Sequence, residues 1–402
     1  MSIVESPTTP DAASIDPFDL EFLRDPLPHH AALRDAGPVV RLEKYGVYAM
    51  ARYDEVHAAL VDWQSFQSAA GVGLSNFRHE KPWRPPSVLL EADPPRHDGP
   101  RAVVAPLLTT RRLRDLEQRW RADAATVVDA VLDRGDEFDA VTDLAEVFPL
   151  RVFPDAVGIG KEGRENLLPY GDFAFNAFGP PNALVTSAAP HMPPITEWIG
   201  RQCLRENLTE DGFGAQIWAA ADRGEISPEH APMIVRSLLT AGVDTTVTGI
   251  AAIVHALAHT PGAVARLRRD RSLTRTAFEE AVRLTSPVQT FFRTATRDLQ
   301  VGGVDIADGE KILMFLGSAN RDPRRWEDPD TFDLDRDPSG HVAFGMGIHQ
   351  CVGQHIARLE AICVLDALLD RIVDIEPAAP EQRHLNNTLV GWEHMPVRVH
   401  RG

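Results

Sequence analysis

The sequence predicts a mainly α-helical fold with a minor β part. Most of the chain follows helical patterns of apolar residues, broken by loops rich in proline and glycine, and strand-like runs are few and short. The 402 residues, 44% hydrophobic and 25% charged, suffice for a large buried core. Length alone would allow two or three domains. Residues 1–16 are rich in Ser, Thr, Pro and Asp and predict a flexible N-terminal segment.

Charge and cysteine content limit the classes of partner and compartment. A net charge of −17 argues against nucleic acid or an anionic membrane as partner, because both are bound by clustered Lys and Arg. No run approaches the roughly 18 uninterrupted apolar residues of a membrane span. Three cysteines leave an odd one and give no disulfide framework. We therefore expect a cytoplasmic protein without a membrane partner.

Five short runs have the pattern of strands. They are Val39 to Leu42, Tyr45 to Met50, Leu299 to Val304, Lys311 to Phe315 and Pro396 to His400.

Two loop-rich regions interrupt the helical patterns, at residues 69–96 and 178–182. Loops of this length in a compact protein are often lids or walls of a binding site, although plain surface connections are equally compatible with the pattern.

The longest helical pattern begins at Ser227, Pro228 and Glu229 and runs to Thr260. At about 1.5 Å per residue, such a helix is long enough to cross the molecule. Its centre, residues 241–246, reads Ala-Gly-Val-Asp-Thr-Thr, which is poor helix material. We therefore expect a local feature that compensates for this composition.

The most informative segment surrounds Cys351, which precedes a helical pattern with an apolar face. Free N–H groups and the helix dipole at that position favour an anionic sulfur, the form that binds metals. Gly345 and Gly347 allow tight turns, and Gly353 leaves room for a flat group. A buried, inert cysteine is the commoner fate of a lone thiol, and Cys203 and Cys363 fit that alternative.

The segment Phe344-Gly345-x-Gly347-x-His349-x-Cys351-x-Gly353 resembles the haem-binding signature of the cytochrome P450 family at every specified position. The resemblance implies that residues 17–402 form a single catalytic domain. The implied fold is a triangular α-helical prism with small β-sheets. Haem b would lie between the long central helix and the cysteine-loop helix, with Cys351 as its thiolate ligand.

Further segments resemble this family in the right order. Glu280 and Arg283 match its E-x-x-R motif, and the resemblance makes them a buried ion pair that braces the cysteine loop. Four residues are implied to meet the haem propionates, because cations and imidazoles suit carboxylates: His97, Arg101, Arg293 and His349. The signature residues Phe344, Gly345 and Gly353 are implied to contact the cofactor. Taken alone, each cation is more often a solvated surface charge.

The centre of the long helix resembles the oxygen-activation motif of the family. By this resemblance a threonine hydroxyl bonds back to its own helix and opens a groove for O2, Thr245 steadies the bound oxygen, and Asp244 relays protons. A glycine for close helix packing and a satisfied threonine are the plainer alternative. The chain has no flavin or iron–sulfur domain, so we expect electrons from a ferredoxin and its NAD(P)H-dependent reductase, docked near Arg111, Arg112 and Arg114.

Four segments, beginning at Lys81, Phe175, Val235 and Ser286, resemble the bacterial subfamily that oxidises para-substituted benzoic acids such as 4-methoxybenzoate. The implied substrate residues include arginines and hydroxyls for a carboxylate and phenylalanines for a ring. They are Arg84, Ser87, Phe175, Phe178, Arg236, Ser237, Thr240, Ala241, Val288 and Phe291. Thr240 departs from the serine expected in this subfamily, and its methyl group would narrow the pocket.

Other functions compatible with the same cofactor remain open. The substrate of such an enzyme can also be another small apolar molecule, such as a terpenoid or a natural-product precursor. A peroxide-using or rearranging enzyme needs neither Asp244 nor Thr245, and their presence argues against both. A non-catalytic haem-thiolate sensor or carrier needs only the cysteine loop.

Overall fold

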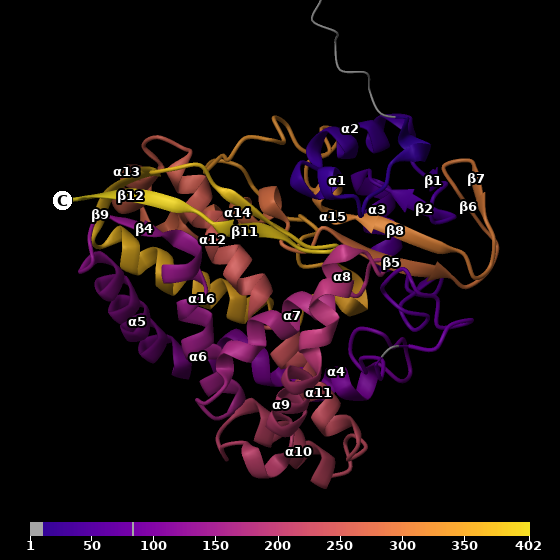
Figure 1. Ribbon diagram of the computed structural model, residues 1–402, viewed down its shortest axis with the longest axis horizontal. Coiled ribbons are helices and arrows are strands. Elements are labelled where there is room, and N and C mark those ends of the chain that lie inside the picture. The colour runs from indigo at the N-terminus through magenta and orange to yellow at the C-terminus, as the bar shows by residue number, and fades with distance from the viewer. Residues whose placement is uncertain (1–10, 83) are drawn as a thin grey trace, which may run out of the picture.

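The computed structural model describes residues 11–82 and 84–402. The molecule has a triangular outline, with helices filling the lower part and the strands along the upper side of the view (Figure 1). The helices are α1 (Leu20–Arg24), α2 (Leu27–Ala36), α3 (Tyr53–Val61), α4 (Asp98–Val104), α5 (Thr110–Leu132), α6 (Val147–Val157), α7 (Leu167–Asn176), α8 (Ala183–Ala188), α9 (Met192–Gln202), α10 (Phe213–Asp222), α11 (His230–Ala241), α12 (Asp244–Ala258), α13 (Ala263–Arg269), α14 (Thr274–Thr285), α15 (Leu316–Ala319) and α16 (Gln354–Leu369). The predicted mainly helical fold is confirmed.

The strands form four small sheets. They are β1 (Val40–Leu42), β2 (Val47–Met50), β3 (Phe66–Gln67), β4 (Glu137–Asp139), β5 (Thr290–Ala295), β6 (Leu299–Val301), β7 (Val304–Ile306), β8 (Lys311–Phe315), β9 (Ile372–Pro377), β10 (Gln382–Leu385), β11 (Val390–His394) and β12 (Pro396–Arg401). The largest sheet has the order β1-β2-β8-β5-β3, and β4-β12-β9, β6-β7 and β10-β11 form the others.

Each of the five runs predicted as a strand contains a strand in the structure, with one difference in detail. The run Leu299 to Val304 is a hairpin, β6 and β7, because Gly302 and Gly303 both adopt positive φ and turn the chain.

The central helix carries the second difference. The expected single helix from Ser227 to Thr260 is divided into α11 and α12 at Gly242 and Val243. The hydroxyls of Thr245 and Thr246 donate to the carbonyls of Ala241 and Gly242, at 2.9 and 3.3 Å, and so compete for oxygens that would accept helical N–H groups. A Cβ at Gly242 would meet the Phe153 ring at 2.3 Å, so this break packs closely against α6.

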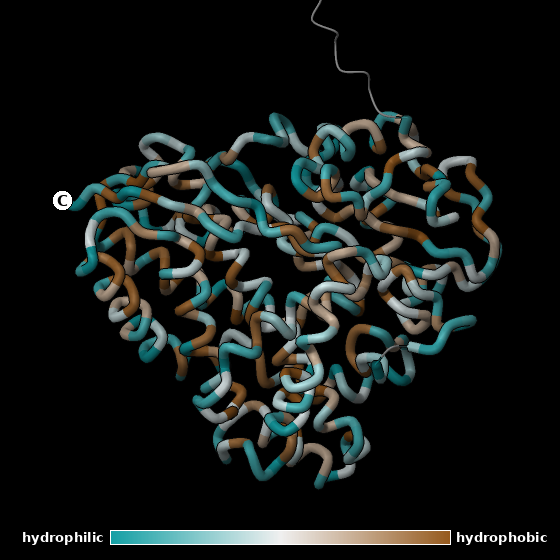
Figure 2. The backbone as a smooth tube through the Cα atoms, viewed as in Figure 1, coloured by the Kyte–Doolittle hydropathy of each residue, from teal (hydrophilic) through white to brown (hydrophobic). Residues whose placement is uncertain are grey.

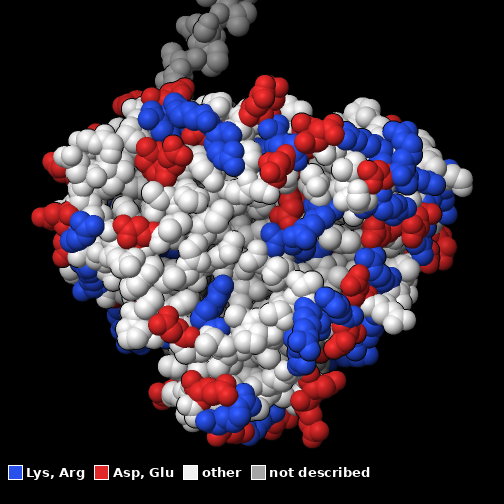
Figure 3. Space-filling view, turned by 180° about the vertical axis from the view of Figure 1, so that it is seen from behind, with Lys and Arg blue, Asp and Glu red and all other residues white. Residues whose placement is uncertain are grey.

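Both halves of the divided helix lie in the core. The stretch His230–Ala258 is the one part of the described chain that is long and apolar enough to cross a membrane, and 72% of its most apolar portion is buried inside the fold. Figure 2 shows hydrophobic segments along the inner helices and strands and hydrophilic ones in the peripheral loops. Figure 3 shows the rear face, where acidic and basic side chains lie intermixed around a largely uncharged centre.

The N-terminal segment that we expected to be flexible falls partly outside the described residues, which begin at Asp11. Of the remainder, Ile15 is buried, and Asp16 accepts hydrogen bonds from Lys44 and Tyr45. These contacts attach residues 11–16 to the body of the protein. That residues 17–402 form a single catalytic domain stays a prediction.

Candidate active site

The cysteine loop precedes α16 and turns at two glycines, as the sequence predicted. Gly345 and Gly347 adopt φ values of +65° and +68°, which favour glycine. A Cβ at Gly347 would also meet the Leu60 carbonyl oxygen at 2.8 Å. The Cys351 N–H donates to the Phe344 carbonyl at 2.7 Å and closes the loop. This backbone path sets Cys351 just before the first turn of α16.

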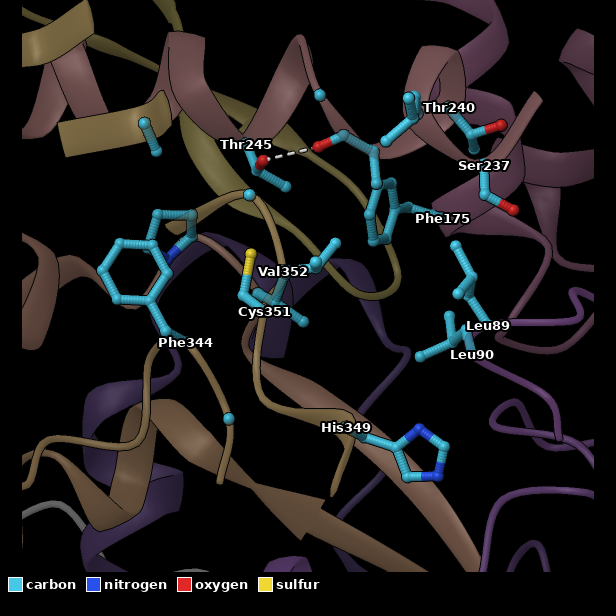
Figure 4. A pocket seen from close by; sticks show the side chains of 18 of the residues that line it. Leu89, Leu90, Phe175, Ser237, Thr240, Thr245, Phe344, His349, Cys351 and Val352 are labelled. Atoms are coloured by element: carbon cyan, nitrogen blue, oxygen red, sulfur yellow. Dashed lines mark hydrogen bonds between the residues drawn. The ribbon is translucent and has the colours of Figure 1, made fainter. Parts of the chain in front are cut away.

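The sulfur of Cys351 points across a cavity toward the helix segment that carries Thr245 (Figure 4). Burial raises the pKa of the Cys351 thiol, while the N–H groups of Gly353 and Gln354 and the charge of Arg101 act in the opposite direction. All three cysteines lie in the described part of the chain, and only Cys351 lines this cavity. Burial raises the pKa of Cys203 and of Cys363 to about 12, which fits the expected inert role.

The cavity wall opposite Cys351 is the break between α11 and α12. Ala241, Gly242, Thr245 and Thr246 line it. Asp244 does not: its carboxyl lies behind the helix, where a Cβ on Gly171 of α7 would overlap its Oδ2. This Oδ2 is buried without a hydrogen-bond partner, and burial raises the pKa of Asp244 well above its usual range.

Donor groups gather at one edge of the cavity, which Arg101, Arg293 and His349 line. His97 packs against His349, with ring centroids 4.8 Å apart, and its Nδ1 lies 3.5 Å from Asp98 Oδ1. His349 Nε2 lies 3.1 Å from Asp93 Oδ1. Arg293 is 3% exposed and donates to the Phe292 carbonyl, and burial lowers its pKa to about 10. The remaining N–H groups of this buried guanidinium suit an anionic partner.

These features provide a test of whether the site suits haem. The thiol faces a gap with apolar walls that include Phe344, Val352 and Leu316, and the edge of the gap carries the buried Arg293 and the partly buried Arg101 and His349. Gly353 offers an uncrowded surface, since the nearest atom to a Cβ placed there is the sulfur of Cys351 at 3.9 Å. A flat apolar macrocycle with acidic side chains matches this arrangement.

The distal end of the cavity is polar. Arg84, Ser87, Arg236, Ser237 and Thr240 all line it. The hydroxyls of Ser87 and Ser237 lie 3.1 Å apart, and Arg236 donates to the Pro85 carbonyl at 3.0 Å. The Thr240 hydroxyl donates to the Arg236 carbonyl at 2.7 Å and is therefore occupied within its own helix.

Phe175, Phe178 and Phe291, the three phenylalanines predicted to contact a substrate ring, line the same cavity. Phe178 makes edge contacts with Phe175 and with Phe291, each with centroids 5.9 Å apart. Figure 4 shows the Phe175 ring directed into the space near Thr245. Val288 lines the same wall and forms a backbone bridge with Leu389. The structure thus brings all ten sequence-predicted substrate residues to one cavity.

The sequence did not single out several other residues that line the cavity, among them Leu89, Leu90, Tyr170, Leu238 and Val352. Leu89 and Leu90 belong to the run Val88-Leu89-Leu90 in the predicted loop, and three consecutive apolar residues in a loop were the available signal. Trp83, in the first segment of the subfamily resemblance, lies outside the described residues.

The predicted pair of Glu280 and Arg283 is fully buried on α14, with Nε to Oε2 at 2.7 Å and Nη2 to Oε1 at 2.8 Å. Arg283 also donates to the carbonyl of Asn320 at 2.6 Å, and the Asn320 side chain accepts from the Val342 N–H at 2.7 Å. The pair is thereby connected to the start of the cysteine loop.

Known proteins of one family are similar to this chain in sequence. A family model described as cytochrome P450 matches residues 213–387. Cytochrome P450 CYP199A2 of Rhodopseudomonas palustris is 56% identical over 385 residues, which cover 96% of this chain and 93% of that protein. The cytochrome P450 monooxygenase PikC of Streptomyces venezuelae is 31% identical over 98% of this chain and 96% of its own length.

Solved structures agree with this fold. CYP109Q5 from Chondromyces apiculatus has a TM-score of 0.81 at 31% identity and covers 97% of this chain and 99% of that one. The cytochrome P450 CREJ, in complex with (4-ethylphenyl) dihydrogen phosphate, has a TM-score of 0.84 at 25% identity over 97% and 100% of the two chains. The protein belongs to the cytochrome P450 family and is a monooxygenase whose cofactor is haem held by a cysteine thiolate. Its reaction therefore uses O2 and a redox partner.

Proposed function

We propose that this monooxygenase oxidises small aromatic carboxylic acids, above all para-substituted benzoates such as 4-methoxybenzoate. The main support is the lining of one cavity, which combines Cys351 with two arginines, two serine hydroxyls and three phenylalanines in mutual contact. Arg84, Arg236, Ser87 and Ser237 would hold the carboxylate, Arg236 through solvent. Phe175, Phe178 and Phe291 would contact the ring, with Ala241 and Val288 beside it and Thr240 narrowing the slot.

One relative supports this substrate class. The ligand named with the CREJ structure is a phenyl ring with a para ethyl group and an anionic phosphate. A para-substituted benzoate has the same arrangement of a ring between an anionic group and a small alkyl substituent. A polar anchor for the carboxylate and a flat apolar slot for the ring would direct the para substituent toward the reaction centre. Oxidation would then occur selectively at that substituent.

We assign Cys351 as the thiolate ligand of the haem. His97, Arg101, Arg293 and His349 would bind the propionates, because the last three line one edge of the cavity and His97 packs against His349. Phe344, Gly345 and Gly353 would pack against the macrocycle. When bound, the haem supplies O2 activation and oxidation of a C–H bond.

Asp244 and Thr245 would act as the proton-handling pair. The Asp244 carboxyl lies behind the helix and outside the cavity, so it would have to turn toward Thr245 to pass a proton. Burial raises the pKa of Asp244 well above its usual range, which favours its protonated form. The Thr245 hydroxyl lines the cavity and donates a hydrogen bond to the Ala241 carbonyl at 2.9 Å, so it is fixed on the side of the cavity opposite Cys351.

With 4-methoxybenzoate as substrate, hydroxylation of the methoxy carbon would give an unstable product. This product would release formaldehyde and leave the phenol.

The proposed redox partner is a small acidic ferredoxin with an NAD(P)H-dependent reductase. Arg111, Arg112 and Arg114 are exposed near the start of α5, which follows the His97 to Arg101 segment. Clustered cations increase the association rate of an acidic partner.

We also propose a cytoplasmic location, because the cysteines are unpaired and the one long apolar stretch of the described chain is largely buried.

A spectroscopic titration tests the proposal. The reduced protein with carbon monoxide should give the red-shifted Soret band of a thiolate-bound haem. The ferric protein should change spin state with 4-methoxybenzoate and not with 4-methoxybenzamide, whose neutral amide cannot pair with arginine. Arg84→Gln should weaken binding of the acid about tenfold or more. A thiolate band with equal binding of acid and amide would exclude the benzoate proposal and leave the monooxygenase intact.

A further inference from the structure

A second group of potential ligands lies far from the cysteine loop, at the opposite end of α12 from Thr245. His255 is in the last turn of α12, and His259 is the residue that caps it. Glu381 directly precedes β10, the first strand of the β10-β11 hairpin. At about 1.5 Å per residue, this end of the helix is roughly 20 Å from Thr245. The group therefore has no part in the proposed substrate or haem contacts.

The three side chains converge. His255 Nε2 lies 3.3 Å from Glu381 Oε2, and His259 Nε2 lies 3.6 Å from Glu381 Oε1. One potential ligand atom from each residue lies within 4.8 Å of the others. Histidines at i and i+4 share one face of a helix, which is the spacing that helical zinc sites use. His255 and His259 border a cavity of about 440 Å³, so a ligand has room to approach the two imidazoles.

Neighbouring groups fix these side chains in orientations suitable for a metal. The Nδ1 of His259 lies 2.9 Å from the His255 carbonyl oxygen, which makes Nδ1 the protonated nitrogen and leaves a lone pair on Nε2. Trp392 Nε1 donates to Glu381 Oε2 at 2.8 Å, and the His255 ring stacks on Trp392 with centroids 4.7 Å apart. The rings of His255 and His259 stack at 4.2 Å.

The site is partly shielded from solvent. The two histidines are 31% and 44% exposed at their side chains, against 21% for Glu381. The ligands are thus partly shielded and still reachable from solvent.

We propose that His255, His259 and Glu381 form a binding site for a divalent transition-metal ion of the zinc type. Two imidazoles and one carboxylate are a ligand set that Zn²⁺ accepts, with a fourth position left for water. Three metal–ligand bonds would then replace the contacts that His255 and His259 make with Glu381.

The bound ion ties the end of α12 to the β10-β11 hairpin. After β10, Asn386 donates to the Asp172 side chain at 2.7 Å, and Asn387 donates to the Asn176 carbonyl at 2.9 Å, so the hairpin also holds α7. Leu389, in the same hairpin, packs with Phe175 and Phe178. The ion therefore stabilises the hairpin that supports this wall of the substrate cavity.

The test uses the purified holoprotein, treated with EDTA and exchanged into a buffer that does not bind metal. Isothermal titration with zinc chloride should give saturable binding of about one equivalent, and Zn²⁺ should raise the Tm of unfolding. His259→Gln and Glu381→Gln should each weaken this binding about tenfold or more and abolish the rise in Tm. His191→Gln removes an exposed imidazole elsewhere and should change neither result.

Two outcomes would overturn the site. Absence of saturable zinc binding is one, and equal affinity in the wild type, His259→Gln and Glu381→Gln is the other. Circular dichroism of the metal-free variants ensures that a loss of binding is not a loss of fold. The inference is independent of the proposed substrate, since none of these measurements requires turnover.

Discussion

Arg84, at the distal end of the substrate cavity, donates from Nη1 to Oε2 of Glu91 at 2.8 Å. The Glu91 side chain is 2% exposed and also accepts the Ser87 N–H at 2.7 Å. The proposed carboxylate anchor is therefore already joined to a buried negative charge. A substrate carboxylate must share Arg84 with Glu91.

Glu91→Gln should tighten the binding of 4-methoxybenzoate several-fold. Glutamine keeps an acceptor oxygen for Arg84 and Ser87, while loss of the charge removes repulsion of the substrate. Two charges about 7 Å apart at an effective dielectric of about 20 interact by roughly 2 kcal/mol, enough for such an effect. The spin-state titration measures it, and the neutral amide should bind the variant and the wild type alike. Weaker or unchanged binding of the acid by Glu91→Gln would contradict the prediction.

Glu280→Gln should destabilise the protein by about 3–5 kcal/mol, because it leaves the buried Arg283 without its charged partner. Unfolding in urea measures the loss, and haem should dissociate at lower urea than in the wild type. Arg201→Gln is the matched control: its pair with Glu197 is 53% and 72% exposed, and its removal should cost less than about 1 kcal/mol. Equal effects of the two substitutions would mean that burial of the first pair has no energetic consequence.

The sequence was sufficient to predict those parts of the site that depend only on residues close together in the chain. The turns at Gly345 and Gly347 and the pairing of Glu280 with Arg283 each involve residues a few positions apart. Backbone sterics and helix geometry then determine the contact before any tertiary structure is considered. The back-bonded hydroxyl of Thr245 is of the same kind.

Contacts made by irregular loops or between distant segments were not predictable in this way. The pair of Arg84 and Glu91 depends on how an irregular loop folds back, and helical or strand periodicity carries no information on that path. Glu381 meets His255 because the β10-β11 hairpin packs beside α12 through β11, a tertiary contact without local signal. The sequence marked residues 241–246 as poor helix material, but it did not show that the long helix divides there.

Asp244→Asn should lower product formation about tenfold to a hundredfold, while the substrate-induced spin shift stays unchanged. The asparagine is isosteric, so packing against Gly171 is preserved and only the transferable proton of the carboxyl is lost. Thr245→Ser keeps the hydroxyl and should retain most product formation, whereas Thr245→Ala should not. Product formed per NAD(P)H consumed is the measurement. Normal yield in Asp244→Asn would remove Asp244 from proton transfer.

The ionisation of Glu360, on α16, should lower the free energy of unfolding of the protein as pH rises above about 5. Its two carboxyl oxygens are buried without hydrogen-bond partners, and burial raises the pKa of Glu360 well above its usual range. The folded state therefore keeps a proton that the unfolded chain releases near pH 4.5. Because the folded state then binds more protons than the unfolded state, the free energy of unfolding falls with pH by up to about 1.4 kcal/mol per unit.

Glu360→Gln removes this proton difference and should be more stable than the wild type, by a margin that grows between pH 5 and pH 7. Urea unfolding at both pH values measures the margin. Glu206→Gln, on an exposed turn, is the control and should change stability by less than about 0.5 kcal/mol at either pH. Asp244 is present in all three proteins, so its own pH dependence cancels in the comparison. A margin that is constant with pH would mean that Glu360 ionises normally within the fold.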